Sequence, residues 1–559
     1  MSRMAFLNAR LRASPGALPW RPRAAAAPGR RRRGILFAHE AGRLLRLAGP
    51  IVVSQLAAIG MTLTDTLMVA PLGPEALAGV AVAASFHIVT IVLCTGTVLG
   101  MGPLVSQAFG AGDRAECRRV LVQGLWVAAL LALPITAVTA AGRPLAHLLG
   151  QAPAVADGAG DFLLALSGGV APTLFFVAFR QYLEGMGITR VAMVLSFLGL
   201  VVNALGDWAL IYGVPGVVAP LGVMGSGLAT TLVRWCMLAA LVVYMARRAD
   251  LTPFGRESLR PVWARIRRIV SIGVPVGATM AAEVGIFALA AVMMGWLGAV
   301  QLAAHQVTMN LASGTFMVGA GVSLGGSIRV GHHIGARNPR AVRRAVLVTY
   351  GLSLGFMGLC AVLFLAVPEA LIGLFTKDPG VVAYGAQLLF MAALFQVFDG
   401  AQVTGLMVLR AAADTRAPML LTVVGYWAVG LPVAYLLGFH TPLRHVGIWT
   451  GLVASLMVVS VLLAWRVRRV IWRRPLAYSI APAPRAEAPE AALAMGDSRE
   501  KHHTESTEST ENRRGSLLTP LTPCETCSSD GPPGETRSRP IPFSPFDIHH
   551  LYLGSDLPS

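Results

Sequence analysis

Residues 72–78, LGPEALA, recur 225 positions later as residues 297–303, LGAVQLA. The match extends on both sides, so that residues 50–113 follow the same pattern as residues 275–338 without any insertion. The chain is therefore a tandem repeat of one ancestral unit. In a hydrophobic protein, a repeat of this kind indicates a transporter whose substrate site lies between the two halves.

The composition places this repeat in a lipid bilayer. The 559-residue chain is 55% hydrophobic and only 13% charged, whereas about a quarter of the residues in a soluble protein are charged. A helix needs about 20 apolar residues to cross the hydrocarbon layer. Twelve segments satisfy this requirement, near residues 48–70, 77–102, 120–141, 161–183, 191–213, 221–246, 269–296, 302–328, 344–367, 380–409, 417–438 and 446–466.

Six of these spans fall in each half, so the two halves enter the membrane in the same sense. We therefore expect an all-α polytopic membrane protein of twelve transmembrane helices, in two six-helix lobes related by a pseudo-twofold axis along the membrane normal. The predicted domains are a disordered basic N-terminal extension, an N-lobe, an inter-lobe linker, a C-lobe and a disordered tail. Their bounds are 1–44, 45–247, 248–268, 269–470 and 471–559.

The two end segments differ in composition from the repeat. Residues 1–38 contain nine arginines and no acidic residue before Glu40, which suits a cytoplasmic extension, an over-extended start site or an organellar transit peptide. We favour the cytoplasmic extension or the over-extended start site over the transit peptide. The tail is rich in Pro, Ser, Thr and Glu, and it lacks enough apolar residues to form a core.

The basic residues predict the orientation. The connections that follow even-numbered spans carry 19 arginines, whereas those that follow odd-numbered spans carry three Lys or Arg residues. By the positive-inside rule, both termini are expected on the cytoplasmic side, and we place the protein in a bacterial inner membrane. The net charge of +18 then reflects topology and contact with anionic membrane lipid, and we expect no nucleic-acid partner.

The motifs of several enzyme classes are missing, so we expect no enzymatic activity. The only lysines are Lys377 and Lys501, and neither follows a glycine, which excludes a phosphate-binding P-loop. The pair His39-Glu40 lacks the second histidine of a zinc protease motif. We expect no cofactor, and the energy must come from a gradient of Na⁺ or H⁺ or from that of the cargo.

Four acidic residues lie well inside the predicted spans: Asp65, Asp207, Glu283 and Asp399. A charged side chain at the middle of a bilayer costs on the order of 3 kcal/mol, so such residues are rare unless they line a cavity or bind a cation. Each could instead be a helix-end acid or the partner of an arginine. We favour the interpretation that these acids carry the transport chemistry.

The spacing of the acids predicts one polar site in each lobe. Asn203 and Asp207 are four residues apart and project from one helical face, and Asp65 lies at a matching depth. This cluster can bind a proton, or it can coordinate a small cation through hard oxygen ligands. In the second half, Glu283 aligns with position 58, seven residues before Asp65, and Asp399 is expected to complete a cation site with it.

Other polar and aromatic residues give weaker signals. Arg234, near the middle of span 6, either neutralises an acid of the cavity, forms a structural pair or extends to the membrane surface. His305 is more typical of a structural histidine than of a proton relay. Gln55, Phe287 and Tyr426 are candidates for an adaptable, largely apolar substrate cavity.

Motifs in both halves resemble one family of membrane transporters. In the first half these are Pro50, Gln55, Asp65-Thr66, Leu72-Gly73, Leu77-Ala78, Gln107 to Gly112, Arg180 to Gly185, Thr189-Arg190, Asn203 and Asp207. In the second half they are Gly273 to Pro275, Glu283, Leu302 to Gln306, Phe395-Gln396 and Asp399. Together, over residues 45–470, they resemble the multidrug and toxic compound extrusion (MATE) family, and especially its NorM-like branch. One motif departs from the family, because its Leu-Arg-Gly-x-Gly after span 10 reads Leu409-Arg410-Ala411-Ala412-Ala413 here.

The resemblance implies antiport, in which sodium or protons enter while a cationic, amphipathic organic compound leaves by alternating access of the two lobes. By position, it implies that Asp65, Asn203 and Asp207 form the N-lobe cation or proton site. It likewise implies that Glu283 and Asp399 form the C-lobe cation site, with Na⁺ as the favoured ion there. We expect a monomer.

Three other interpretations remain at this stage. A flippase of the same superfamily would move a lipid-linked precursor, although such proteins often have extra spans and a strongly basic cavity. A sensor or scaffold with this fold would be expected to lose the buried acids, and all four are present. An ion channel fits a two-lobe repeat less well than a carrier does.

Overall fold

The computed structural model describes residues 30–248, 251 and 259–473. These residues are helical, and the strand-type pairing among them is one isolated bridge between Val214 and Val218. Eleven helices are long and apolar enough to cross a membrane, and the total becomes twelve if two helices that meet at a 48° bend form one broken span. This confirms the predicted all-α polytopic class.

The helices of the first half follow one another with short connections. They are α2 (Arg30–Val69), α3 (Pro74–Val98), α4 (Met101–Gly110), α5 (Arg114–Ala140), α6 (Gly142–Leu148), α7 (Pro153–Ser167), α8 (Val170–Gly185), α9 (Arg190–Tyr212) and α10 (Val223–Ala246). The bent pair is α7 and α8, and a 3-10 turn over Ala70–Leu72 separates α2 from α3.

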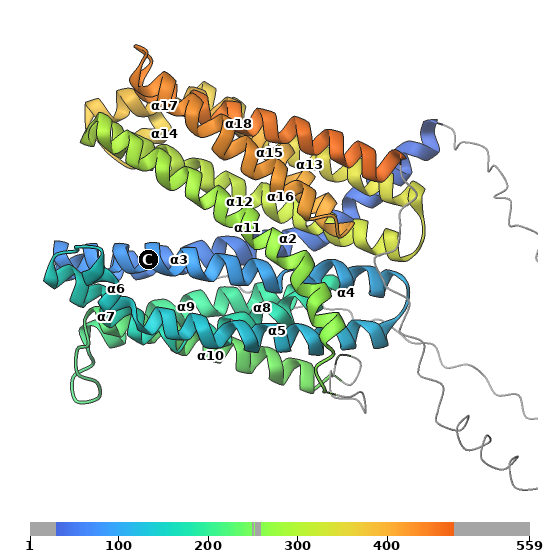
Figure 1. The fold of residues 1–559 in the computed structure, drawn as a ribbon, viewed down its shortest axis with the longest axis horizontal. Helices are drawn as coiled ribbons and strands as arrows, with labels where there is room; N and C mark the ends of the chain where they lie inside the picture. The colour runs from blue at the N-terminus through green and yellow to red at the C-terminus, as the bar shows by residue number, and fades with distance from the viewer. Residues whose placement is uncertain (1–29, 249–250, 252–258, 474–559) are drawn as a thin grey trace, which may run out of the picture. The chain divides into compact units, whose positions relative to one another are not determined.

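The second half repeats this plan. Its helices are α11 (Trp263–Leu297), α12 (Ala299–Gly335), α13 (Pro339–Ala366), α14 (Pro368–Gly373), α15 (Pro379–Ala411), α16 (Arg416–Val423), α17 (Leu431–Phe439) and α18 (Arg444–Val467). π-helical turns follow α16 and α18, over Val424–Gly430 and Arg468–Arg473. In Figure 1, α3 to α10 form one bundle and α12 to α18 form the other.

Helix α2 contacts both lobes. Near its start, Leu44 packs with Val322 of α12 in a small core. Farther along, Ser54 hydrogen-bonds to Ser196 of α9 at 2.8 Å. The 40-residue helix therefore crosses from the C-lobe to the N-lobe.

Helix α11 makes the reverse crossing. Its first part buries Ile266 and Ile269 in the core of the N-lobe, whereas its later part buries Met293 in the core of the C-lobe. The lobes predicted as 45–247 and 269–470 therefore exchange the first part of their first helices. The sequence pattern does not reveal this exchange, because an apolar helix face looks the same whichever bundle it contacts.

The helix contacts between the lobes occur in pairs that are related by the repeat offset of 225 residues. An ideal Cβ atom added to Gly110 would lie within 3.0 Å of the carbonyl oxygen of His332, and one added to Gly335 would lie equally close to that of Gln107. These contacts are equivalent, because each residue of one pair lies 225 positions from a residue of the other. The backbones touch at the end of α4 and α12 that precedes the arginine-rich loops. We call this region the seam.

The seam continues toward the middle of the molecule with the same symmetry. A Cβ atom on Gly96 of α3 would clash with the backbone of Gly277 of α11, and a Cβ atom on Gly321 of α12 would lie within 3.0 Å of the Val52 side chain of α2. These residues are again paired by the offset of 225. The exchange of contacts is what a pseudo-twofold axis between the halves requires.

One predicted boundary is wrong. Part of the extension predicted as disordered, residues 30–44, forms the first turns of α2. The reason is burial, because Glu40 is 2% exposed and forms an ion pair with Arg329 at 2.8 Å. The rest of that extension, residues 249–250 and 252–258 of the linker, and residues 474–559 of the tail lie outside the described residues.

Candidate functional site

The structure brings the three predicted N-lobe residues together. Asp65 comes from α2, and Asn203 and Asp207 come from one face of α9, where both are fully buried. Asp65 interacts with both of them, and Thr230 of α10 donates a hydrogen bond to its Oδ2 atom at 3.3 Å. Three helices therefore converge on one oxygen-rich cluster, the N-lobe cluster.

Several polar atoms of this cluster lack a hydrogen-bond partner. Oδ1 of Asp65, both carboxylate oxygens of Asp207 and both amide atoms of Asn203 are buried without a well-formed hydrogen bond among the described residues. Buried polar atoms normally have a partner. A proton shared between the carboxyl groups or a small cation would supply one.

A positive charge is an electrostatic neighbour of the N-lobe cluster. Arg234 of α10 interacts electrostatically with Asp65 and with His87 of α3. The acid with which Arg234 interacts is therefore Asp65 of the N-lobe cluster, which does not line the cavity.

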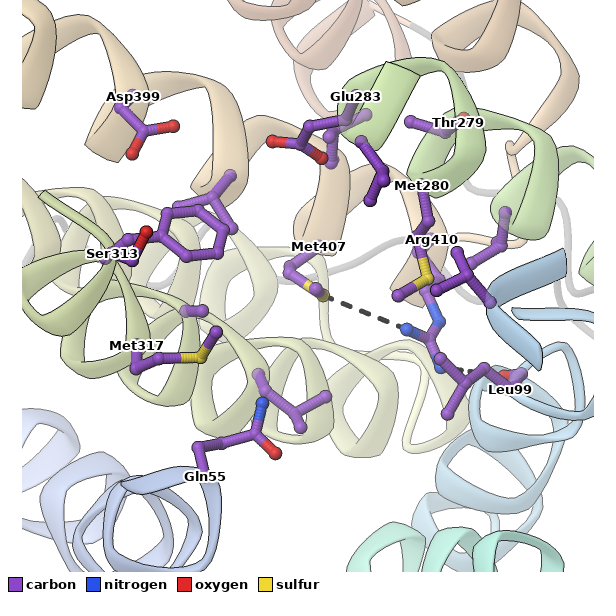
Figure 2. A pocket seen from close by; sticks show the side chains of 18 of the residues that line it. Gln55, Leu99, Thr279, Met280, Glu283, Ser313, Met317, Asp399, Met407 and Arg410 are labelled. Atoms are coloured by element: carbon purple, nitrogen blue, oxygen red, sulfur yellow. Dashed lines mark hydrogen bonds between the residues drawn. The ribbon is translucent and has the colours of Figure 1, made fainter. Parts of the chain in front are cut away.

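The two predicted C-lobe acids also meet. Glu283 of α11 and Asp399 of α15 turn their carboxylates toward the same cavity (Figure 2) and interact electrostatically. Gln402 and Tyr426, both buried, lie beside Glu283. Among the described residues, no basic side chain is an electrostatic neighbour of either acid. We call these two acids the C-lobe pair.

The cavity that the C-lobe pair faces has a volume of about 500 Å³. Its walls come from α2, α3 and α8 on one side and from α11, α12 and α15 on the other. Gln55 and Phe287 line it, whereas Tyr426 lies behind Glu283 and the N-lobe cluster is not part of its wall. Most of the wall is apolar and adaptable, with the methionines Met280, Met309, Met317 and Met407. Such a lining suits ligands of varied shape.

The floor of the cavity is polar and joins the lobes. Arg410 of α15, 7% exposed, donates a hydrogen bond from Nη2 to the backbone oxygen of Leu99 at 2.8 Å. The Nε2 atom of Gln107 donates to the backbone oxygen of Ala411 at 2.7 Å. These bonds cross from one lobe to the other at the arginine-rich end of the cavity.

The sequence reasoning missed one buried acid in this floor. Glu184 is 2% exposed, pairs with Arg180 at 3.2 Å and also interacts with Arg410. The spacing of four residues between Arg180 and Glu184 was the available signal. It was overlooked because the pair lies at the end of a span, where charged residues are common.

His305 has a structural role, in agreement with the interpretation favoured from the sequence. The indole Nε1 of Trp449 donates a hydrogen bond to its Nδ1 atom at 3.1 Å. Both side chains are buried in the C-lobe. Among the described residues, no group of three or more His, Cys, Asp or Glu side chains is arranged to hold a metal ion.

Comparisons with known proteins agree with this architecture. The MatE family model matches residues 50–209 and 275–436, one segment in each half. The probable multidrug resistance protein NorM of Pseudomonas putida is 39% identical over 443 residues, which cover 77% of this chain and 96% of that protein. The multidrug resistance protein NorM of Burkholderia vietnamiensis is 35% identical over 75% of this chain and 92% of its own length.

The fold itself is known from solved structures. The eukaryotic MATE transporter AtDTX14 aligns with a TM-score of 0.71 and 21% identity, over 79% of this chain and 98% of that chain. Taken together with the family match in both repeats and the NorM relatives, this similarity shows that the protein belongs to the MATE family of membrane transporters, as a NorM-like member.

Proposed function

We propose that this protein is a secondary active multidrug efflux transporter, which exchanges Na⁺ or H⁺ for cationic, amphipathic drugs or toxic organic compounds. As a MATE transporter, it is not an enzyme. The observation that carries the proposal is the position of Glu283 and Asp399 in the wall of an apolar cavity between the lobes. A carboxylate in such surroundings attracts an organic cation and a small coupling ion alike.

Competition for these carboxylates provides the coupling. A small cation and an organic cation cannot both neutralise the same acids at full occupancy, so each displaces the other. If the two bind preferentially to different lobe arrangements, their exchange moves the cavity from one side of the membrane to the other. The seam and the bonds of Arg410 and Gln107 are the contacts that must break in that movement.

The orientation follows from the arginine distribution. The seam lies at the arginine-rich end, which the positive-inside rule assigns to the cytoplasm. The described arrangement is then closed toward the cytoplasm. The proposal includes a monomer in the inner membrane of a bacterium, with membrane lipid around it and both termini in the cytoplasm.

One observation favours the flippase alternative. Arg180 and Arg410 line the floor of the cavity, and a pair of guanidinium groups suits the phosphate of a lipid-linked precursor. However, both are engaged by the protein itself, because Arg180 pairs with Glu184 and Arg410 bonds to the backbone of Leu99. We therefore retain drug efflux as the proposal.

Efflux of a cationic dye from drug-sensitive cells tests the proposal. The wild type should export the dye, whereas Asp399→Asn and Asp65→Asn should stop export at equal expression, with sodium and pH varied separately to identify the coupling ion. Glu369→Gln is a matched control, because it removes an exposed acid of α14 outside the cavity. If well-expressed wild type moves no dye under any gradient, drug efflux is wrong and lipid-linked precursors should be tested next.

A further inference from the structure

The N-lobe cluster differs from the C-lobe pair in holding an arginine. We propose that Arg234 is a built-in counter-ion for Asp65, which limits the N-lobe cluster to one exchangeable small cation and directs the cationic cargo to the C-lobe pair. This inference rests on the proposed function, because it concerns how one transporter divides ions and cargo between its lobes.

The position of Arg234 follows from the helix that carries it. Thr230 and Arg234 are four residues apart on α10 and therefore share one helical face. Thr230 donates its hydrogen bond to Asp65 at 3.3 Å, and Arg234 is an electrostatic neighbour of the same carboxylate. Two side chains on one face of α10 therefore interact with the same acid, Asp65.

The neighbouring helices hold this face in place. The hydroxyl of Thr231 donates to the backbone oxygen of Ala165 at 2.7 Å, and the indole of Trp235 donates to that of Gly168 at 3.0 Å. Both acceptors lie at the bend between α7 and α8. A Cβ atom at Gly169 would lie 3.2 Å from Cδ of Arg234, so the absence of a side chain at the bend makes room for the arginine.

The groups that face the guanidinium come from several helices. Asp65 on α2 and His87 on α3 interact electrostatically with it, while Asp207 on α9 interacts with Asp65. The Nη1 atom of Arg234 is buried without a hydrogen-bond partner among the described residues. An arginine that extended to the membrane surface would have water there, so this side chain is committed to the interior.

Counting charges gives the consequence. Counted formally, two carboxylates and one guanidinium leave the N-lobe cluster with one net negative charge, which one proton or one Na⁺ neutralises. The C-lobe pair has two negative charges and no basic neighbour among the described residues. The N-lobe cluster is not part of the wall of the cavity that the C-lobe pair faces, and its Arg234 repels an organic cation. Cargo binding is therefore directed to Glu283 and Asp399.

Charge-swap variants test this count. The proposal assigns one exchangeable cation to the N-lobe cluster of the wild type, none to Asp65→Asn, two to Arg234→Gln, and again one to the double variant Asp65→Asn/Arg234→Gln. Arg234→Lys keeps the fixed charge and should keep the wild-type number. His87→Gln removes a polar neighbour without removing a fixed charge, so its number should also stay at one.

The number of exchangeable cations at the N-lobe cluster can be measured without a transport assay. Thermal unfolding of the full-length protein in lipid nanodiscs is followed as a function of pH in choline chloride, and as a function of Na⁺ at fixed pH. By linkage, each additional cation bound in the folded state makes the unfolding equilibrium constant fall about tenfold for each tenfold rise in the concentration of that cation. The unfolding equilibrium constant of Arg234→Gln should therefore depend on cation concentration with one more bound cation than that of the wild type, and that of Asp65→Asn with one fewer.

Two results would overturn the inference. One is an Arg234→Gln protein whose cation dependence equals that of the wild type, and the other is a double variant that keeps the dependence of Arg234→Gln. If Arg234→Gln does not fold, the double variant decides, because removal of both charges should restore the folded protein. Dye efflux is recorded separately, so a wild type that fails to export dye would reject the proposed function without affecting the cation number.

Discussion

The N-lobe cluster and the C-lobe pair occupy related places in two copies of one repeat, but their surroundings differ. In the N-lobe cluster, Asn203 and Asp207 are fully buried, the cluster is not part of the cavity wall, and Arg234 interacts electrostatically with Asp65. The C-lobe pair faces a cavity of about 500 Å³, with no basic neighbour among the described residues. The two copies of the repeat therefore suit different tasks, since a compensated site suits one small ion, whereas the cargo needs space and uncompensated charge.

The largest effect should be on transport kinetics, where one variant in each site changes a different kinetic quantity. Glu283→Gln removes a charge from the cavity wall, so it should weaken binding of a cationic dye by on the order of 10- to 100-fold, equivalent to about 1–3 kcal/mol. Asp207→Asn removes a charge that the dye does not touch, so it should reduce the maximum rate and leave the apparent affinity unchanged. Dye export from proteoliposomes at several dye concentrations measures both quantities, and equal changes in KM for the two variants would contradict the division of tasks.

The seam offers the opposite comparison, because its two halves are equivalent. Gly110→Ala and Gly335→Ala each place a methyl group against a backbone oxygen of the other lobe, and overpacking of this kind costs about 1–3 kcal/mol. Both variants should lose thermal stability in the cytoplasm-closed arrangement, and by similar amounts. Gly42→Ala is the control, because a Cβ atom there meets nothing within 4 Å. A large effect on one side only would show that the seam is not symmetric.

Smaller effects are expected for the side chains that bond across the seam. Gln107 donates to the backbone oxygen of Ala411 at 2.7 Å, and its repeat equivalent His332 contacts the backbone oxygen of Gly185 at 2.7 Å. Replacing either by Ala should weaken the closed arrangement by about 1 kcal/mol. An engineered cysteine in the cavity floor, such as Met407→Cys, should then react faster with a thiol reagent added from the cytoplasmic side. Unchanged labelling rates in both variants would exclude a latch at these positions.

The smallest effect concerns a residue that departs from the family pattern. Ala413 has a φ angle of 56°, a left-handed conformation that costs a non-glycine residue roughly 1–2 kcal/mol. Ala413→Gly should relieve this strain and raise the melting temperature slightly, because the greater freedom of glycine in the unfolded chain offsets part of the gain. Ala412→Gly, at a position with φ of −84°, should lower it. A stabilising effect of both substitutions would rule out backbone strain as the cause.

Much of the site could be predicted from the sequence because its signals are local. Asn203 and Asp207 share a helical face by their spacing, and charged residues stand out in apolar spans. The offset of 225 also placed Glu283 near the face that corresponds to Asp65. The roles of these residues in ion and cargo binding stay predictions that the variants above test.

Other features depend on distances across the molecule. The sequence places Arg234 inside a span but does not identify the acid with which it interacts. Whether its side chain turns toward Asp65 or toward the membrane surface depends on how α10 packs against the bend of α7 and α8. The buried floor with Glu184 and Arg410 was missed for the same reason. A charge near a span end looks like a loop residue until the opposite lobe covers it.

By itself, the sequence determined the repeat, the membrane location, the helical class and the acidic residues buried in each lobe, because these follow from hydropathy and periodicity along the chain. Only the tertiary structure decided that α2 and α11 exchange lobes, that glycines bring the backbones together at the seam, and that one acid site is compensated while the other faces the cavity. The physical reason is that packing and electrostatic interactions depend on distances in space, which a pattern of residue types does not specify.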